Sequence, residues 1–428
     1  MFPSICKPNN MFFQNAISRR KYASLPFVLL LLCIGACSTN KEAPSEGLIH
    51  IDVLQAFKEQ KSMNLSDFVK EVEFVQLESS KDAYFMNARS FTVGEKYIMI
   101  ADDGENRIIL FDRNGNFIRH IGRKGKGPGE YNNPWQAAMD PDEEYIFIAD
   151  GMIQKLIKYS VEGEFISEIS TKDLALGRFM DEIRFISDDR FIILLRRPFR
   201  EVDGFATMLM FDKDLNLVKK ILPRANDENL VLHTHPNGDL GFGDSRVTFW
   251  EPYLDTLYTI TKEGDAIPTH VVGMSKGGPS KEYAKTPTYG RDPNLEPENS
   301  IFSITEFGGY LHINGRSNGE WFGALYNHKS GDIFQLTSGT SCDTTGNFKI
   351  RGLTNDLYGI DPASLYVYSP KIDRVISWVR PEWIASSYDL DCIRDKKVKF
   401  PKLRDQFLEI AEDPEATGQL VLVLMKLK

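Results

Sequence analysis

The stretch "ADDGENRIILFDRNGNFIRHI", residues 101–121, returns later in the chain as "ADGMIQKLIKYSVEGEFISEI", residues 149–169. The two stretches align without a gap at an offset of 48 residues, the difference between 149 and 101. Both begin with Ala-Asp, carry a glycine at the same inner position and repeat Phe-Ile near the end. The chain therefore contains a repeated structural unit, and the period of this repeat limits the fold class.

Each unit consists of short β-rich runs separated by turn residues. The first unit contains "EKYIMIAD", "RIILFD" and "FIRHI", and the second contains "AAMD", "EEYIFIAD", "KLIKYS" and "FISEI". Such runs predict strands, and Asn114-Gly115 between two of them predicts a hairpin turn. Four strands in a repeat of about forty to fifty residues indicate one blade of a β-propeller.

Weaker copies of the unit continue along the chain and bring the number of blades to six. The later units contain "RFIILL" with "TMLMFDKDLNLVKKI", then "TLYTITKEGDAIPTHVV", "YLHING" with "WFGALYNHKSGDIFQL", and "SLYVYSPKIDRVISWV". Five or seven blades would follow if residues 276–300 or the C-terminus were divided differently. We expect residues 48–428 to form an all-β, six-bladed β-propeller of four-stranded antiparallel blades.

Both ends of this domain contain a strand-like run, at 72–77 and at 419–428. We expect the two runs to complete one blade together, which closes the ring and covers edges that would otherwise be open to aggregation. An amphipathic helix is predicted at 402–413, directly before the last strand.

A glycine-rich segment, "GRKGKGPGEY" at 122–131, has the composition of a phosphate-binding loop. It does not match the phosphate-binding patterns, because no Lys-Ser or Lys-Thr follows Gly127 and because Pro128 lacks a backbone N–H. A similar segment, "GMSKGGPSKEYAKTP", follows the fourth unit. We therefore interpret both segments as crossovers between blades, with Tyr131 and Tyr283 pinning each crossover to its sheet.

These residues also resemble a known group. "GKGPGEY" followed by "IFIAD" and "KLIKY" is similar to NHL-type propeller repeats. "IHIDV" and "NLSDFVKEVEFVQLESS" before these repeats resemble the start of the six-bladed β-propeller lipoproteins of Bacteroidetes. The resemblance covers nearly all of residues 48–428. It implies the architecture and a location in the envelope of a Gram-negative bacterium, and it implies no catalytic residues.

The N-terminus has the pattern of an export signal. A basic stretch precedes an apolar run at 25–34, which is too short to span a bilayer. The run ends in "IGAC", which resembles the bacterial lipobox and implies that Cys37 carries the lipid. We predict a lipoprotein signal peptide at 1–36 and a flexible tether at 37–47. An ordinary secretory signal with an incidental cysteine is the alternative.

The charge of the chain bears on its partners. The formal net charge is −9, and loss of residues 1–36, which contain four basic and no acidic residues, changes it to −13. Nucleic-acid binding depends on basic residues that neutralise phosphates. The acidic domain therefore argues against a nucleic-acid partner and leaves the membrane, through the lipid, as one predicted partner.

Two cysteines, Cys342 and Cys392, remain in the domain after Cys37. They could pair in an oxidising envelope, or they could be two buried thiols. Of these two alternatives we favour the unpaired thiols.

No sequence pattern indicates a catalytic centre, a metal site or a cofactor. The strongest metal candidate is His233-Thr234-His235, which places two imidazoles on one side of a strand but lacks an acidic third ligand. Surface or partly buried histidines are the favoured interpretation. Asp102 and Asp150 recur with the repeat, so we interpret them as turn caps rather than catalytic acids. A hydrolase or lyase with a metal or acidic site in the central channel is the alternative function.

Departures from the repeat are the best candidates for ligand binding. Residues 276–300 contain four prolines and no strand pattern, and 196–205 form a smaller insertion. An inert insertion is the alternative. The predicted ligand-binding residues are Tyr283, Tyr289, Arg291, Trp321, Arg196 and Arg197. We therefore predict a non-catalytic, lipid-anchored envelope protein that binds a carbohydrate, a peptide or another envelope protein.

Overall fold

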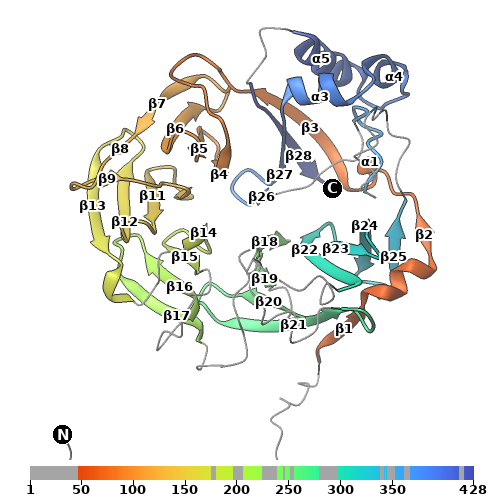
Figure 1. The fold of residues 1–428 in the computed structure, drawn as a ribbon, viewed down its shortest axis with the longest axis horizontal. Coiled ribbons are helices and arrows are strands. Elements are labelled where there is room, and N and C mark those ends of the chain that lie inside the picture. Colours follow the sequence, from red (N-terminus) through yellow and green to blue (C-terminus); the bar gives the residue numbers. More distant parts are fainter. Residues whose placement is uncertain are drawn as a thin grey trace, which may run out of the picture. The chain divides into compact units, whose positions relative to one another are not determined.

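In the computed structural model of the protein, six sheets are arranged in a ring around a common axis (Figure 1). This confirms the predicted all-β, six-bladed β-propeller. The residues that the structure describes are 47–174, 180–195, 206–223, 239–243, 246–250, 255–278, 297–337, 342, 344, 352–360, 367–413 and 419–428. All of them belong to one unit, which extends from Glu46 to Lys428.

In blades 1 to 5 the four strands follow chain order from the axis outward, and neighbouring strands are antiparallel. Blades 1 and 2 consist of β4 (Ala88–Val93), β5 (Tyr97–Asp102), β6 (Arg107–Asp112) and β7 (Phe117–Ile121), then β10 (Gln136–Met139), β11 (Tyr145–Asp150), β12 (Lys155–Ser160) and β13 (Phe165–Ser170). Blades 3 and 4 consist of β14 (Met180–Phe185), β15 (Arg190–Leu195), β16 (Ala206–Asp212) and β17 (Leu217–Pro223), then β18 (Asp239–Gly243), β19 (Arg246–Trp250), β20 (Thr256–Ile260) and β21 (Ala266–Gly273). Blade 5 consists of β22 (Asn299–Phe307), β23 (Tyr310–Ser317), β24 (Glu320–Asn327) and β25 (Ile333–Leu336).

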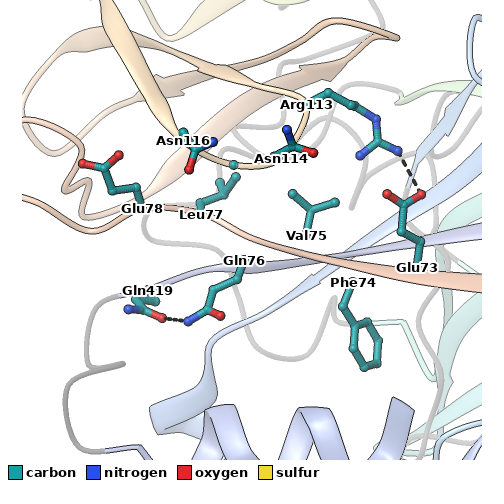
Figure 2. A pocket seen from close by; sticks show the side chains of 11 residues that line it. Glu73, Phe74, Val75, Gln76, Leu77, Glu78, Arg113, Asn114, Asn116 and Gln419 are labelled. Atoms are coloured by element: carbon teal, nitrogen blue, oxygen red, sulfur yellow. Dashed lines mark hydrogen bonds and ion pairs between the residues drawn. The ribbon is translucent and has the colours of Figure 1, made fainter. Parts of the chain in front are cut away.

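Blade 6 closes the ring with strands from both ends of the chain. Its order from the axis outward is β26 (Val367–Ser369), β27 (Arg374–Val379), β28 (Val421–Leu427) and β3 (Val69–Gln76). Gln76 lies opposite Val421 in the antiparallel β3–β28 pair, and the side chains of Gln76 and Gln419 are hydrogen-bonded beside it (Figure 2). The predicted closure by the two terminal runs is confirmed.

The middle strands are apolar on both faces because each blade packs between two others. In β5, Ile98 and Ile100 belong to the core shared with blade 6, which includes Leu422. The alternate residues Met99 and Ala101 belong to the core shared with blade 2. Successive residues of a strand point to opposite faces, so a run such as "YIMIAD" supplies two cores at once.

Two short strands near the N-terminus, which sequence analysis did not predict, extend two of the blades. β1 (Ile49–Asp52) pairs in parallel with β21, and β2 (Gln60–Lys61) pairs in parallel with β25. The 3-10 helix η1 (Val53–Lys58) connects them, and Asp52 caps its start by accepting a hydrogen bond from the N–H of Leu54 at 3.2 Å. Blades 4 and 5 therefore have five strands each.

Three helices lie between β27 and β28: α3 (Pro381–Ser387), α4 (Leu390–Asp395) and α5 (Pro401–Glu412). Proline occupies the first turn of α3 and of α5, where its missing N–H costs no hydrogen bond. The helix α5 confirms the helix expected at 402–413. Two shorter elements complete the inventory, α1 (Leu65–Phe68) before β3 and the 3-10 helix η2 (Lys172–Leu174) after β13. In the described part of the chain, no helix has the length and apolar character needed to cross a membrane.

The two cysteines of the domain form a disulfide, which corrects our expectation of two unpaired thiols. Cys342 and Cys392 are bonded, with their Cα atoms 5.7 Å apart. The fold places the segment at 342 against α4, and the N–H of Asp389 at its start donates to the carbonyl of Cys342 at 2.8 Å. A sequence separation of 50 residues could not reveal this proximity.

The crossover interpretation of residues 122–131 is confirmed. Two short parallel strands, β8 (Arg123–Lys124) and β9 (Glu130–Tyr131), form between blades 1 and 2. Tyr131 is only 1 % exposed, and its hydroxyl donates to the carbonyl of Ile121 at 2.7 Å. Burial raises the pKa of this tyrosine well above its ordinary value. Tyr131 therefore pins the crossover to the end of β7, as predicted.

The same crossover already uses the N–H groups that a phosphate would need. The N–H of Gly127 donates to the carboxylate of Glu130 at 2.9 Å, which holds the pKa of Glu130 below its ordinary value. The N–H of Gly129 donates to the carboxylate of Glu168 at 2.9 Å. Gly122 has a φ of +67°, and a Cβ there would lie 2.7 Å from the Tyr159 hydroxyl. The glycines therefore serve the tight path of the chain.

Two faces of the ring follow from the alternating strand directions. The turns from the innermost to the second strand define the hairpin face, and their described residues are 94–96, 140–144, 186–189, 308–309 and 370–373. The opposite end carries the turns from the second to the third strand and the crossovers that lead into each innermost strand. The described residues of the connections on this crossover face are 77–87, 103–106, 122–135, 151–154, 171–174, 255, 274–278, 297–298, 318–319, 337, 342, 344, 352–360, 380–413 and 419–420.

Candidate functional site

The large exposed apolar side chains are unevenly distributed over the described residues. Five of them lie on the strands at the outer edges of blades: Ile49, Phe165, Ile166, Val218 and Ile267. The other eight lie in connections of the crossover face or near the strand ends that reach it: Tyr84, Met86, Trp135, Met152, Phe302, Trp321, Trp378 and Trp383. No described turn of the hairpin face contains one. The crossover face is therefore the candidate binding surface.

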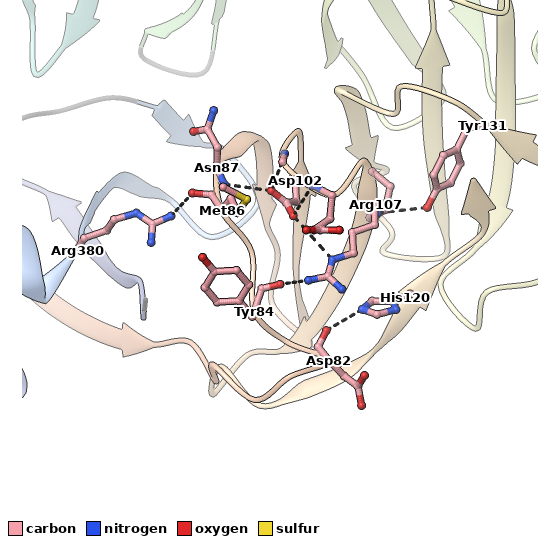
Figure 3. A network of polar contacts seen from close by, with 12 residues as sticks. Asp82, Tyr84, Met86, Asn87, Asp102, Arg107, His120, Tyr131 and Arg380 are labelled. Atoms are coloured by element: carbon pink, nitrogen blue, oxygen red, sulfur yellow. Dashed lines mark hydrogen bonds and ion pairs between the residues drawn. The ribbon is translucent and has the colours of Figure 1, made fainter. Parts of the chain in front are cut away.

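Asp102 holds the blade 1 portion of this face in place (Figure 3). It is fully buried at the end of β5, and its carboxylate accepts from the N–H of Asn87 at 3.1 Å and of Gly104 at 3.0 Å. The guanidinium of Arg107 lies 3.8 Å from the same carboxylate and donates to the carbonyl of Tyr84. One aspartate therefore joins the crossover that enters blade 1 to the next turn of that blade.

Asp150 has the equivalent role in blade 2. It too is fully buried, and it accepts from the N–H of Asn133 at 2.8 Å and of Met152 at 2.9 Å. The crossover that enters blade 2 is thereby joined to the β11–β12 turn. The interpretation of both recurring aspartates as turn caps is confirmed. These caps position the exposed side chains of Trp135 and Met152, which are 39 % and 49 % exposed.

The indole of Trp135 is oriented by a further contact on this face. Its Nε1 donates to the side-chain carbonyl of Asn106 at 3.0 Å. Asn106 lies in the β5–β6 turn with a φ of +55°, a left-handed conformation that asparagine tolerates better than most residues. The ring therefore has a defined orientation and still presents apolar surface to the solvent.

Helix α3 joins the crossover face beside blade 1. Arg380, the residue before the helix, donates to the carbonyl of Met86 at 2.7 Å (Figure 3). Its guanidinium lies 5.6 Å from the ring centre of Phe85. Trp383 on α3 is 42 % exposed, and Met86 is 57 % exposed. An insertion of blade 6 and a crossover of blade 1 therefore contribute apolar groups to the same face.

Blade 5 presents an aromatic pair. Trp321, near the start of β24, is 52 % exposed, and its ring centre lies 5.2 Å from that of Phe302, with the ring planes tilted by 47°. Phe302 sits at a bulge of β22, where the register shifts between Ile301 and Ser303. A bulge redirects a side chain, and here it leaves the phenyl ring exposed beside the indole. Sequence analysis named Trp321 as a binding residue, and this stays a prediction. It did not name Phe302, whose exposure depends on the bulge.

The structure describes Trp321 but not the other residues that sequence analysis singled out. Tyr283, Tyr289, Arg291, Arg196, Arg197, His233, His235 and Cys37 all lie outside the described residues. Sequence analysis also missed Tyr84, Met86, Met152 and Trp383. Their position within the repeat could have pointed to these residues, because all four lie in crossovers or in turns from the second to the third strand.

The histidines of blades 4 and 5 are in or near the core. Burial lowers the pKa of His312 to about 4, so its imidazole is neutral at ordinary pH. His328 Nε2 lies 3.3 Å from the buried carboxylate of Glu306, and its ring centre is 5.2 Å from that of His270. Among the described residues, no three His, Cys, Asp or Glu side chains are arranged to hold a metal ion.

Solved structures of other proteins are similar in fold. A Bacteroides fragilis NCTC 9343 protein described as exported aligns with a TM-score of 0.60 and 15% identity, covering 89% of this chain and 99% of that chain. A DUF4221 family member from Bacteroides vulgatus ATCC 8482 reaches 0.39 at 13% identity, covering 62% and 84%. Hydrazine synthase of Kuenenia stuttgartiensis reaches 0.41 at 11% identity, covering 76% and 84%. At these identities the first likeness shows the fold alone, and the other two carry no argument.

Sequence comparison gives the family. No curated protein sequence matches the chain. The family model described as "Domain of unknown function (DUF4934)" matches residues 48–425, which include every blade of the ring. The chain therefore belongs to the DUF4934 family.

Proposed function

We propose that this protein is an exported, lipid-anchored binding module of the cell envelope, and that its crossover face binds the ligand without catalysis. The observation that carries the proposal is the distribution of exposed apolar groups. Five large apolar side chains are exposed in connections of this face and three more lie on strands that lead to it, whereas the described turns of the hairpin face have none. Exposed apolar groups gathered on one face of a protein are typical of an interaction surface.

The chemistry of the face suits a ligand with both flat apolar surfaces and hydrogen-bonding groups. The rings of Trp321 and Phe302 offer two tilted aromatic surfaces to a sugar ring or a peptide side chain. The connection from β15 to β16 carries the predicted Arg196 and Arg197, and the connection from β21 to β22 carries Tyr283, Tyr289 and Arg291. We propose that these residues contribute to the same binding surface.

Three features support a location outside the cytoplasm. The N-terminal pattern before Cys37 resembles a lipobox. The Cys342–Cys392 disulfide is typical of an oxidising compartment. The Bacteroides fragilis protein of similar fold is described as exported. We propose that the domain is tethered through a lipid on Cys37 in a Gram-negative envelope.

The binding proposal is tested by titrating the purified protein with soluble envelope polysaccharides, peptidoglycan fragments and peptides, with calorimetry as the measurement. We expect one class to bind. We expect Trp321→Ala combined with Phe302→Ala to weaken its binding by about tenfold or more, because contact with an aromatic ring contributes about 0.5–1.5 kcal/mol and two rings are removed. The control is Glu144→Ala, an exposed position on the hairpin face. Equal weakening by both variants, or turnover of the ligand, would contradict the proposal, and turnover would favour a hydrolase or lyase.

The anchor is tested by Cys37→Ala. Without the thiol no diacylglycerol can be attached, and a tether without a lipid has no stable hold on a bilayer. We expect the variant to move from the membrane fraction to the soluble fraction and to lose labelling by radioactive palmitate. Unchanged labelling would rule out lipidation at this cysteine.

A further inference from the structure

The outer edge of a blade is where this chain adds its extra strands. β1 pairs in parallel with the last four residues of β21, from His270 to Gly273. β2 pairs in parallel with Gln335 and Leu336, the last two residues of β25. In both places an extended segment satisfies the open edge of an outermost strand with backbone hydrogen bonds. The end of an outermost strand in this ring is therefore able to accept a parallel strand.

The corresponding edge in blade 6 borders a cleft. The cleft has a volume of about 440 Å³ and is lined by Glu73–Glu78 on one side, by Arg113–Asn116 on the other side and by Gln419 (Figure 2). It begins along the last four residues of β3, the same portion that β21 uses to pair with β1. Within the described part of the chain, β3 is the terminal strand of its sheet.

The backbone of β3 presents hydrogen-bonding groups at this edge. The N–H of Leu77 donates to the carbonyl of Leu420 at 2.9 Å, so these two residues form a hydrogen-bonded pair. The same register places Phe74 opposite Val423. Because bonded and non-bonded pairs alternate in an antiparallel ladder, the N–H groups of Phe74 and Gln76 point away from β28. They face the outer edge of the sheet, where an added strand would lie.

The cleft has two defined ends. At one end the guanidinium of Arg113 contacts the carboxylate of Glu73 at 3.0 Å. At the other end the β6–β7 turn approaches so closely that a Cβ on Gly115 would lie 2.2 Å from the carbonyl oxygen of Gln76. The N–H of Glu78 donates to the carbonyl of Gly115 at 2.8 Å, which fixes this end. The space therefore suits a short extended segment beside Glu73–Gln76.

The charges of the lining indicate the side chains of the occupant. Two carboxylates, Glu73 and Glu78, line the cleft, and Arg113 is the one cationic side chain among the lining residues. Hydrogen bonds from Ser80 and from the Phe117 N–H hold the pKa of Glu78 below its ordinary value, so this carboxylate is ionised at neutral pH. Because Arg113 already neutralises Glu73, Glu78 leaves the lining with a net negative charge, which favours a segment that carries a lysine or arginine.

We propose that this cleft is a second binding site, which takes an extended, basic segment of a partner protein as a parallel strand on β3. The main-chain hydrogen bonds of β3 supply affinity, and the carboxylate of Glu78 supplies the preference for basic side chains. The site lies on the outer edge of blade 6 and shares only Leu77, Glu78 and Gln419 with the connections of the crossover face, so we expect it to be independent of the aromatic pair in blade 5.

The experiment uses the purified full domain with its tether and a random library of short peptides displayed on phage. We expect the selected peptides to be rich in Lys and Arg, and a synthetic copy to slow the exchange of the amide hydrogens of Phe74 and Gln76. Protection of amides on the crossover face instead, or the recovery of no peptide above background, would overturn the proposal.

Two variants of the protein test how the same peptide binds. Gln76→Pro removes an N–H that points away from β28, so the backbone hydrogen bonds between β3 and β28 remain. We expect it to weaken binding of the peptide by about tenfold or more. Glu73→Lys should shift the selected peptides from basic to acidic sequences and keeps the claim testable if the proline variant does not fold. Trp321→Ala should leave the affinity unchanged. Unchanged affinity in Gln76→Pro, or loss of affinity in Trp321→Ala, would overturn the assignment to β3.

Discussion

The hairpin face and the crossover face of the ring are made by the same strands, and yet they differ in length, polarity and contacts. The described turns of the hairpin face have two to five residues, whereas the crossovers into blades 1 and 2 extend over 77–87 and 122–135. The hairpin turns are polar and carry buried carboxylates, and the crossover face exposes aromatic and methionine side chains. The hairpin face therefore uses buried carboxylates to join neighbouring blades, and the crossover face exposes the side chains that we propose bind a ligand.

Glu143 shows how the hairpin face joins blades. This residue of blade 2 is 4 % exposed, and its carboxylate accepts from the N–H groups of Glu95, Lys96 and Tyr97 of blade 1 at 2.7–2.9 Å. Gly94 makes the approach possible, since a Cβ there would lie 2.4 Å from the carboxyl group. A single acidic side chain thus satisfies three N–H groups of a turn in the neighbouring blade.

The largest expected effect tests this joining function. Glu143→Ala leaves three backbone N–H groups without their charged acceptor, so we expect the free energy of unfolding to fall by about 4 kcal/mol. Chemical denaturation monitored by tryptophan fluorescence is the measurement. The neighbouring Glu144→Ala, at an exposed position, is the matched control and should change stability by less than about 0.5 kcal/mol. Equal stabilities of the two variants would mean that the hairpin face does not stabilise the ring.

A smaller effect is expected where the crossover face is structural. Tyr131→Phe removes the hydroxyl that donates to Ile121 and leaves the ring in the core, so we expect a loss of about 1 kcal/mol. Tyr84→Phe, at a ring that is 41 % exposed, is the control and should be nearly neutral. Differential scanning calorimetry measures both. A neutral Tyr131→Phe would show that packing of the ring alone pins the crossover.

The smallest effect sharpens the contrast between the faces. Met152→Ala changes a side chain that is 49 % exposed on the crossover face, so we expect the free energy of unfolding to change by no more than a surface substitution does, about 0.5 kcal/mol or less, in the same denaturation measurement. If this variant unfolds as readily as Glu143→Ala, the exposed groups of the crossover face contribute to the fold, and the assignment of that face to binding loses its basis.

Sequence analysis recovered the blades because the repeat carries its own turn signals. Gly115 and Gly163 have positive φ angles in the equivalent hairpins, and Asp102 and Asp150 cap the equivalent turns. It missed β1 and β2, because two to four residues without a repeat partner give no periodic signal. It also missed Phe302, whose exposure depends on a bulge, and the pairing of Cys342 with Cys392, which depends on where α4 packs.

By itself, the sequence determined the number and build of the blades, since hydrophobic alternation and turn residues act over a few neighbouring positions and repeat along the chain. Tertiary structure decided which face gathers exposed rings, which strand edges gain a fifth strand, and which cysteines meet. These outcomes depend on contacts between residues tens to hundreds of positions apart, such as Gln76 with Val421, and such contacts arise only when the ring closes.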